Sequence, residues 1–171
     1  MHVLMGPHPQ DESEPRQIEI RIDDHDIWNL GQDLALIIAA GVRKLREAAA
    51  GAPFVEDRDV PPELRSGRER NSIWEDPDDH WTARWHWVLD EMIWSFDVIA
   101  KGDPRDQFYS GRSDWRYVEV APEPCDTQPM YSPVPGPDHS LTHDSAAEER
   151  HEARLQNGLR LFADYCRCLW T

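Results

Sequence analysis

The stretch from His80 to Phe96 carries four of the chain's eight tryptophans: Trp81, Trp85, Trp87 and Trp94. Each residue of a helix turns by ~100°, so an apolar stripe recurs at steps of three and four. On that count one arc holds the core candidates, which are Trp81, Trp85, Val88, Leu89, Met92, Phe96 and Ile99. Trp87 and Trp94 lie outside this arc. The pattern therefore predicts a helix with a core face and, on its flank, a site or a second packing partner.

The flank combines aromatic with charged side chains: His80, Arg84, Trp87, Glu91 and Trp94. An indole stacks on a nucleobase and a guanidinium pairs with phosphate, which favours a small nucleotide as the ligand. Three residues from other segments are candidates to converge on the same flank: Arg65, Asn157 and Arg160. In the alternative interpretation, the two tryptophans pack on segment 52–78 while Arg84 pairs with Glu91 or Asp79.

A third strip of this helix is acidic and supports a second hypothesis. Asp90 and Asp97 share it with His86, and Glu152 of the last predicted helix is a candidate partner. Convergent carboxylates bind Mg²⁺ or Mn²⁺, as a metal-dependent nucleotide hydrolase requires. The paired E-x-x-E and E-x-x-D motifs of helical pyrophosphohydrolases are absent, so a solvated acidic face is the alternative. No cofactor is predicted for the favoured, non-enzymatic interpretation.

The acidic turn from Asp23 to Asp26 stands directly before Trp28. Such a turn is typical of an Asx-type turn that precedes a helix, and a contribution of its carboxylates to a pocket is the alternative. Across the chain, 33 acidic and 18 basic residues give a formal net charge of −15. This charge disfavours non-specific binding to nucleic acid or to anionic membranes. A basic protein partner, or mimicry of nucleic-acid charge, is compatible with it.

The three cysteines, Cys125, Cys166 and Cys168, are too few and too unevenly spaced for a disulfide framework, which favours a reducing compartment. The N-terminus has no basic segment followed by an apolar one, so no signal peptide is predicted. No apolar run approaches the ~18 residues of a membrane span. We therefore expect a soluble intracellular protein.

The predicted organisation is a flexible N-terminal arm over residues 1–16 and a single domain over 17–171. Alternating apolar residues predict strands at 18–22 and 115–120, paired in one small sheet. Residues 121–139 hold six prolines and are expected to form an extended linker or flap. Segment 52–78 is expected to be irregular and pinned to the core by apolar side chains.

Three long helices are predicted from periodicity and capping signals: Leu30–Ala50, a second from Asp78 or Asp79 to before Gly102, and Ser145–Trp170. Asn29 and Ser145 are the expected N-caps. The first helix is expected to bury Leu34, Ile37, Ile38, Gly41, Val42 and Leu45. The last is expected to bury Leu155, Leu159, Phe162, Cys166 and Leu169. The predicted fold class is mainly α, with three long helices around a Trp-rich core and a small two-stranded β element.

Several segments form distinctive motifs in order along the chain: IDDHDIWNL (22–30), GAPFV (51–55), DVPPELR (59–65), RWHWVLDEMIWSF (84–96) and NGLRLFADYCRCLW (157–170). With LALII and DQFYSG they cover about half of the chain. On these motifs the chain resembles a family of uncharacterised proteins encoded by tailed double-stranded DNA bacteriophages. It departs from that family around 66–79 and in the proline-rich segment 121–140.

The resemblance implies a phage origin and a location in the cytoplasm of the host. It brings no established activity, so no catalytic residue is transferred to this chain. We expect a non-enzymatic phage accessory protein that binds and neutralises a host factor, either a signalling nucleotide or a defence protein. Two alternatives stay open: the metal-dependent nucleotide hydrolase, and an acidic nucleic-acid mimic that occupies a nucleic-acid-binding host protein. Exposed aromatic residues would also favour a homo-oligomer.

Overall fold

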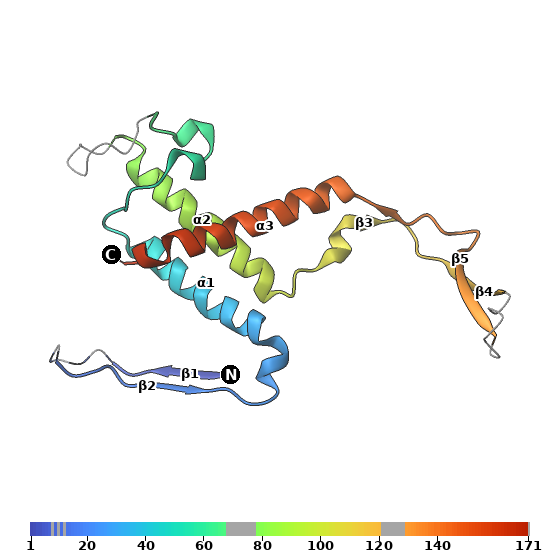
Figure 1. The fold of residues 1–171 in the computed structure, drawn as a ribbon, viewed down its shortest axis with the longest axis horizontal. Coiled ribbons are helices and arrows are strands. Elements are labelled where there is room, and N and C mark those ends of the chain that lie inside the picture. The colour runs from blue at the N-terminus through green and yellow to red at the C-terminus, as the bar shows by residue number, and fades with distance from the viewer. Residues whose placement is uncertain (8, 10, 12, 68–77, 121–128, 171) are drawn as a thin grey trace. The chain divides into compact units, whose positions relative to one another are not determined.

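The structure is a computed structural model that describes residues 1–171 except 8, 10, 12, 68–77, 121–128 and 171 (Figure 1). Its long helices within those residues are α1 (Leu30–Ala48), α2 (Trp81–Ala100) and α3 (Ser145–Tyr165). Its strands there are β1 (His2–Met5), β2 (Ile18–Arg21), β3 (Tyr109–Ser110), β4 (Trp115–Val120), β5 (Met130–Pro135) and β6 (Thr142–His143). The prediction of a mainly α fold with minor β structure is confirmed.

Backbone contacts divide the chain into two compact units. The first comprises Met1–Asp103 together with Ala153–Thr171, and the second is Pro104–Glu152. Helix α3 therefore contributes residues to both. Residues 17–171, predicted as one domain, are shared between these units. No helix of the described residues has both the length and the hydropathy that crossing a membrane requires.

Residues 2–5 near the N-terminus form a strand of a β-hairpin instead of part of a loose arm. Strand β1 pairs antiparallel with β2, with Val3 opposite Ile20 and Met5 opposite Ile18. The expectation of a flexible arm over 1–16 is wrong for residues 2–5. The physical reason is that β-branched and other apolar residues face one another across the pair, which stabilises a ladder that no single strand pattern reveals.

The second predicted strand is present but has a different partner. Strand β4 pairs with β5, and Trp115 lies opposite Pro135 and Tyr117 opposite Pro133. The predicted pairing of 115–120 with 18–22 is wrong, because the nearer segment closes a much shorter loop at lower entropic cost. Part of the predicted proline-rich linker is thus a strand. Proline is tolerated in it since a two-stranded sheet has only edge strands. Residues 121–128 lie outside the described part of the chain.

The core of the first unit lies between α1, α2, α3 and the segment after α1. Its buried cluster consists of Val42, Val55, Val60, Trp85, Val88, Leu89, Met92, Leu161 and Tyr165. Trp85 is fully buried, whereas Trp81 is half-buried and donates its indole N–H to the carbonyl of Ala52 at 2.9 Å. The expectation that α2 presents Trp85, Val88, Leu89 and Met92 to the core is confirmed.

Two helix predictions need correction. Leu34 and Ile37 of α1 were expected in the core but are 44% and 45% exposed, because Ala35 and Ala39 face α2 instead. Small residues at these positions let the two helices approach closely. Gly41, expected in the same stripe as Leu34 and Ile37, is exposed as well. Helix α3 ends at Tyr165, and a 3-10 turn, η5 (Cys166–Cys168), follows, so the expected helix to Trp170 is also wrong. Cys166, expected in the core, is exposed because it lies in this turn and not on the helix stripe.

The N-caps of α1 and α3 also differ from the prediction. The Asn29 side chain makes no capping hydrogen bond to α1. At α3 the carboxylate of Asp144, not Ser145, accepts the N–H of Ala147 at 2.9 Å. An aspartate one residue earlier satisfies the same exposed N–H group equally well, so the sequence pattern identifies the helix start only to within a residue.

Segment 52–67 is pinned to the core, as predicted. Val55 and Val60 are buried, and the Tyr165 hydroxyl donates to the buried carboxylate of Asp59 at 2.7 Å. The same hydroxyl accepts the backbone N–H of Glu56 at 3.1 Å. The irregular segment therefore obtains from α3 the hydrogen bonds that its backbone lacks internally. Residues 68–77 of this prediction lie outside the described ranges.

Candidate functional site

The predicted nucleotide-binding flank does not form a single open site. Arg84, its expected phosphate ligand, is only 2% exposed. Its guanidinium donates to the carbonyl of Leu64 at 2.9 Å and to the carboxylate of Asp78 at 2.8 Å. These bonds tie segment 52–67 and the start of α2 together. Arg84 thus has a structural role, close to the alternative interpretation, in which it pairs with a nearby acid.

Glu91 and Trp94 are brought together by a residue that the sequence interpretation missed. Arg154 of α3 donates to both carboxylate oxygens of Glu91, at 2.7 and 3.0 Å. Its guanidinium also lies over the Trp94 ring, 4.1 Å from the ring centre. A buried glutamate on an apolar helix signals that some cation must face it. The sequence contains no further signal that selects Arg154.

The remaining flank residues separate from this group. Trp87 is half-buried and packs against the main core cluster, and His80 is exposed at the start of α2. Arg160 pairs with Asp59 at 2.8 Å and with Asp164 at 2.9 Å, and it donates to Asn157. Arg65 donates to the carbonyl of Val60 at 3.4 Å. Asn157 and Arg160 thus belong to the Asp59 network.

Burial raises the pKa of Tyr165, and the neighbouring Asp59 carboxylate raises it further. Arg160 and the Tyr165 hydroxyl occupy the two oxygens of that carboxylate. A carboxylate satisfied in this way is a structural element rather than an available general base. The Asp59 network therefore explains why the loop stays on α3 and supplies no reactive group.

The predicted metal ligands each face an arginine. Asp90 pairs with Arg46 at 3.2 Å, and Asp97 pairs with Arg43, both from α1. Glu152, in the second unit, pairs with Arg105 at 2.8 Å. No three His, Cys, Asp or Glu side chains of the described residues gather as a metal site would require. The acidic strip of α2 is accordingly an ion-paired contact with α1.

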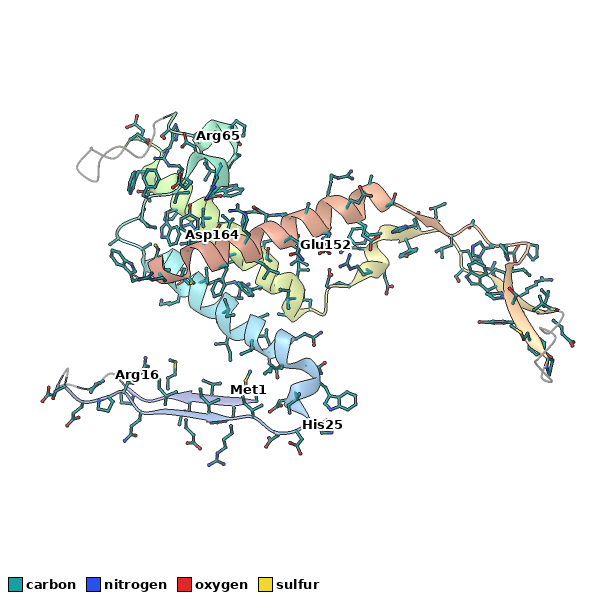
Figure 2. All side chains as sticks on the ribbon, in the orientation of Figure 1. Met1, Arg16, His25, Arg65, Glu152 and Asp164 are labelled. Carbon is teal, nitrogen blue, oxygen red and sulfur yellow. The ribbon has the colours of Figure 1, made fainter. Side chains whose placement is uncertain are left out.

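An uncovered apolar surface is present on the β1–β2 hairpin. Directly opposed residues share a face, so Val3, Ile20, Met5 and Ile18 stand on one side, and Ile22 continues it. We call these five residues the hairpin face. They are 38–59% exposed. Figure 2 shows side chains standing out from both sides of the hairpin between the labelled Met1 and Arg16. The opposite side carries His2, Leu4, Glu19 and Arg21.

The hairpin face ends at the acidic turn. Asp26 accepts the backbone N–H of Asp23 at 2.8 Å and pairs with the α-ammonium of Met1 at 2.5 Å. The hydrogen bond with that ammonium lowers the pKa of Asp26. This ion pair fastens the start of β1 to the turn. Trp28, in the 3-10 helix η1 (Asp26–Asn29), is 86% exposed beside it. The surface is therefore apolar along the strands and acidic at one end.

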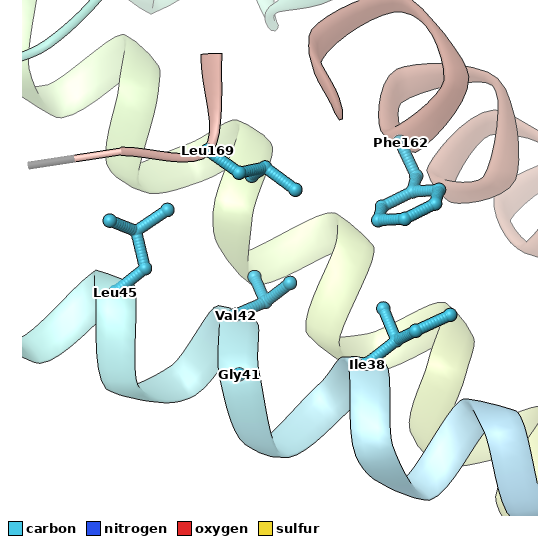
Figure 3. Close-up of a pocket in the computed structure, with 6 residues that line it drawn as sticks. All are labelled: Ile38, Gly41, Val42, Leu45, Phe162 and Leu169. Carbon is cyan, nitrogen blue, oxygen red and sulfur yellow. The ribbon is translucent and has the colours of Figure 1, made fainter. Parts of the chain in front are cut away.

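A separate apolar pocket opens between α1 and the C-terminal end of the chain (Figure 3). Its walls are Ile38, Gly41, Val42, Leu45, Phe162 and Leu169, and its volume is about 330 Å³. Figure 3 shows the α1 side chains directed toward Leu169 and Phe162. Leu169 reaches this position because η5 turns the chain back after α3 ends. Among the residues that the structure describes, no polar side chain takes part in the wall.

No protein-family model, curated protein or solved structure matches this chain. The resemblance to phage-encoded proteins therefore remains a prediction from its motifs.

Proposed function

We propose that the protein is a non-enzymatic phage accessory protein that binds and neutralises a host protein, with counter-defence as its role. The hairpin face is the proposed binding surface. The observation that supports this is that five apolar side chains stand together on a two-stranded hairpin and stay exposed. Isolated two-stranded hairpins are marginally stable in water, and contiguous exposed apolar patches mark interaction sites. A partner that covers this face would stabilise the hairpin and remove its apolar side chains from water.

The charge next to the hairpin face indicates the chemistry of the partner. Asp23, Asp24 and Asp26 lie at its end, and the whole chain carries a net charge of −15. A complementary partner surface would have an apolar strip with basic residues at its rim, which also accelerates encounter. Such a surface occurs on nucleic-acid-binding proteins, so the acidic-mimic alternative is a special case of the same proposal.

A signalling nucleotide is the less supported ligand. Arg84 and Glu91, which would contact phosphate and base, are buried and already paired within the chain. A nucleotide would have to replace these ion pairs at a high cost. The metal-dependent hydrolase is disfavoured for a similar reason, since Asp90 and Asp97 pair with arginines of α1.

We also propose that the core is Trp-rich, with Trp87 as its second tryptophan beside Trp85. Trp87 packs, partly buried, against the same cluster that encloses Trp85. A Trp87→Ala variant that unfolds at a clearly lower urea concentration would support this. Unchanged stability would remove Trp87 from the core.

The host-partner proposal is tested with two matched variants of the hairpin. Ile20→Asn places a polar amide on the hairpin face, and Leu4→Asn makes a comparable change on the opposite side. Tagged wild-type and variant proteins are expressed in the host bacterium, cross-linked and compared by quantitative mass spectrometry. We expect one defined protein with a basic surface to be retained by wild type and Leu4→Asn and lost by Ile20→Asn. Its binding, measured with purified proteins, should weaken with salt.

A third variant, Ile22→Asn, guards against simple loss of the hairpin, because Ile22 follows β2 and is outside the paired register. The proposal is wrong if captured proteins do not differ between wild type and both face variants. It is also wrong if sedimentation shows a wild-type dimer that Ile20→Asn dissociates while no host protein is lost. The hairpin face would then join two copies of this chain.

A further inference from the structure

We infer that the pocket between α1 and Leu169 binds a small neutral hydrocarbon group of about two fused rings. This inference is independent of the hairpin face and of the proposed host partner. It starts from the wall, which within the described residues consists of five apolar side chains and one glycine and offers a ligand no polar side chain. A charged or strongly hydrogen-bonding molecule would lose its water there and find no side-chain partner in return.

The size of the pocket sets the size of the ligand. Its volume of about 330 Å³ falls in the range of small-molecule pockets. It is also about twice the roughly 150 Å³ of an apolar cavity that holds benzene. A two-ring hydrocarbon would therefore contact Ile38 and Val42 on one side and Phe162 on the other. These contacts would be dispersive, with the release of water from the apolar wall as the driving force.

Gly41 is the wall position at which a side chain can be added to fill the pocket. Glycine is among the least favourable residues inside a helix, and close packing is one reason for its presence there. At Gly158 that explanation holds, because an added Cβ would lie 2.0 Å from the Ser95 hydroxyl. At Gly41 an added Cβ would meet no heavy atom within 4 Å. Gly41 is itself exposed, so close packing does not require glycine there, and a larger side chain has room to enter the pocket from this position.

The open space at Gly41 also provides a direct test. Gly41→Leu introduces a side chain into the wall of the pocket while raising the helix propensity of α1, so the protein is expected to stay folded. The matched control is Ala40→Leu, which adds the same side chain at the neighbouring position, exposed like Gly41 but outside the residues that line the pocket. Naphthalene is the probe, and naphthalene-2-carboxylate is its charged counterpart.

Binding is followed by methyl NMR of the full chain. We expect naphthalene to shift the methyl signals of Ile38, Val42, Leu45 and Leu169 saturably in wild type and Ala40→Leu. Gly41→Leu should weaken this binding by about tenfold or more, because the added side chain overpacks the occupied pocket. The carboxylate should bind about tenfold more weakly than naphthalene.

Three outcomes overturn the inference. The first is the absence of saturable shifts at these methyl groups in wild type. The second is equal affinity for naphthalene in Gly41→Leu and wild type, both shown to be folded by their amide spectra. The third is a set of shifts centred on Ile18 and Ile20, which would mean general association with exposed apolar surface. None of these outcomes affects the capture of a host protein by the hairpin face. The ligand pocket and the host-partner proposal can therefore each be wrong without the other.

Discussion

Arg154 covers Trp94: its guanidinium lies 4.1 Å from the centre of the indole ring and at the same time holds Glu91 through both carboxylate oxygens. One arginine of α3 thus satisfies an aromatic and an acidic side chain that α2 presents outside its core stripe. Cation–π attraction and a bidentate ion pair act together here. This arrangement explains Trp94 without a ligand.

Replacing Arg154 tests that explanation. Arg154→Met keeps much of the aliphatic stem but leaves the buried Glu91 carboxylate without a cation. We expect a loss of about 2 to 3 kcal/mol in the free energy of unfolding, measured by urea denaturation. The control Arg150→Met, an exposed arginine of the same helix, should change stability by less than about 0.5 kcal/mol. The double variant Glu91→Met/Arg154→Met should recover part of the loss, since no unpaired charge remains. Equal stability of Arg154→Met and wild type would contradict the structural role.

Gly158 and Gly41 should respond to alanine in opposite directions. At Gly158 the new Cβ would lie 2.0 Å from the Ser95 hydroxyl and 2.6 Å from the Glu91 carbonyl, so α2 and α3 must move apart. We expect Gly158→Ala to cost about 2 kcal/mol through overpacking. Gly41→Ala meets no neighbour and should gain about 0.5 to 1 kcal/mol from helix propensity. Chemical denaturation of both proteins measures the difference, and two gains would show that α2 and α3 are not in close contact at Gly158.

Arg84 separates the two interpretations of the flank. A binding role predicts that Arg84→Ala loses ligand while its thermal midpoint stays within a few degrees. The structure predicts the reverse, because the variant leaves a cavity and removes the bonds to Leu64 and Asp78. We expect a loss of about 2 to 4 kcal/mol and a midpoint lower by roughly 5 to 15 °C, measured by calorimetry. Arg65→Ala, at an exposed position, is the control and should change the midpoint little. A stable Arg84→Ala protein would reopen the flank as a site.

The Tyr165 hydroxyl should make the protein sensitive to alkali. Its pKa is raised above the ordinary value of 10.0 by burial and by Asp59, so folding favours the protonated phenol. This contribution is fully present below pH 10 and is lost as pH rises toward the folded-state pKa. The free energy of unfolding should therefore fall from about pH 10 upward, as measured by urea titrations at fixed pH. Tyr165→Phe should lose this part of the pH dependence. An unchanged alkaline limb in Tyr165→Phe would assign the effect to other groups.

The sequence by itself determined the helices and the part of α2 that enters the core. Trp85, Val88, Leu89 and Met92 recur at helical spacing, and the buried positions of α2 follow that spacing. Local periodicity suffices here because the three- and four-residue steps of a helix place these side chains on one side whatever they pack against. The start of α3 near Ser145 was predictable from local capping signals, although the capping side chain is that of Asp144, one residue earlier.

Only the tertiary structure decided which partner each side chain meets. Glu91 required a cation and strand β4 required a neighbour, but the sequence offered many arginines and only the strand at 18–22 as a predicted neighbour. Arg154 faces Glu91 because the fold brings α3 next to α2, although the two residues are far apart in sequence. Strand β5 pairs with β4 because only a short segment separates the two strands. The exposure of the hairpin face could not be predicted either, because the alternating pattern at 18–22 identifies an apolar side but not the segment that covers it. Periodicity is a property of one segment, whereas pairing and burial depend on free energies that two segments share.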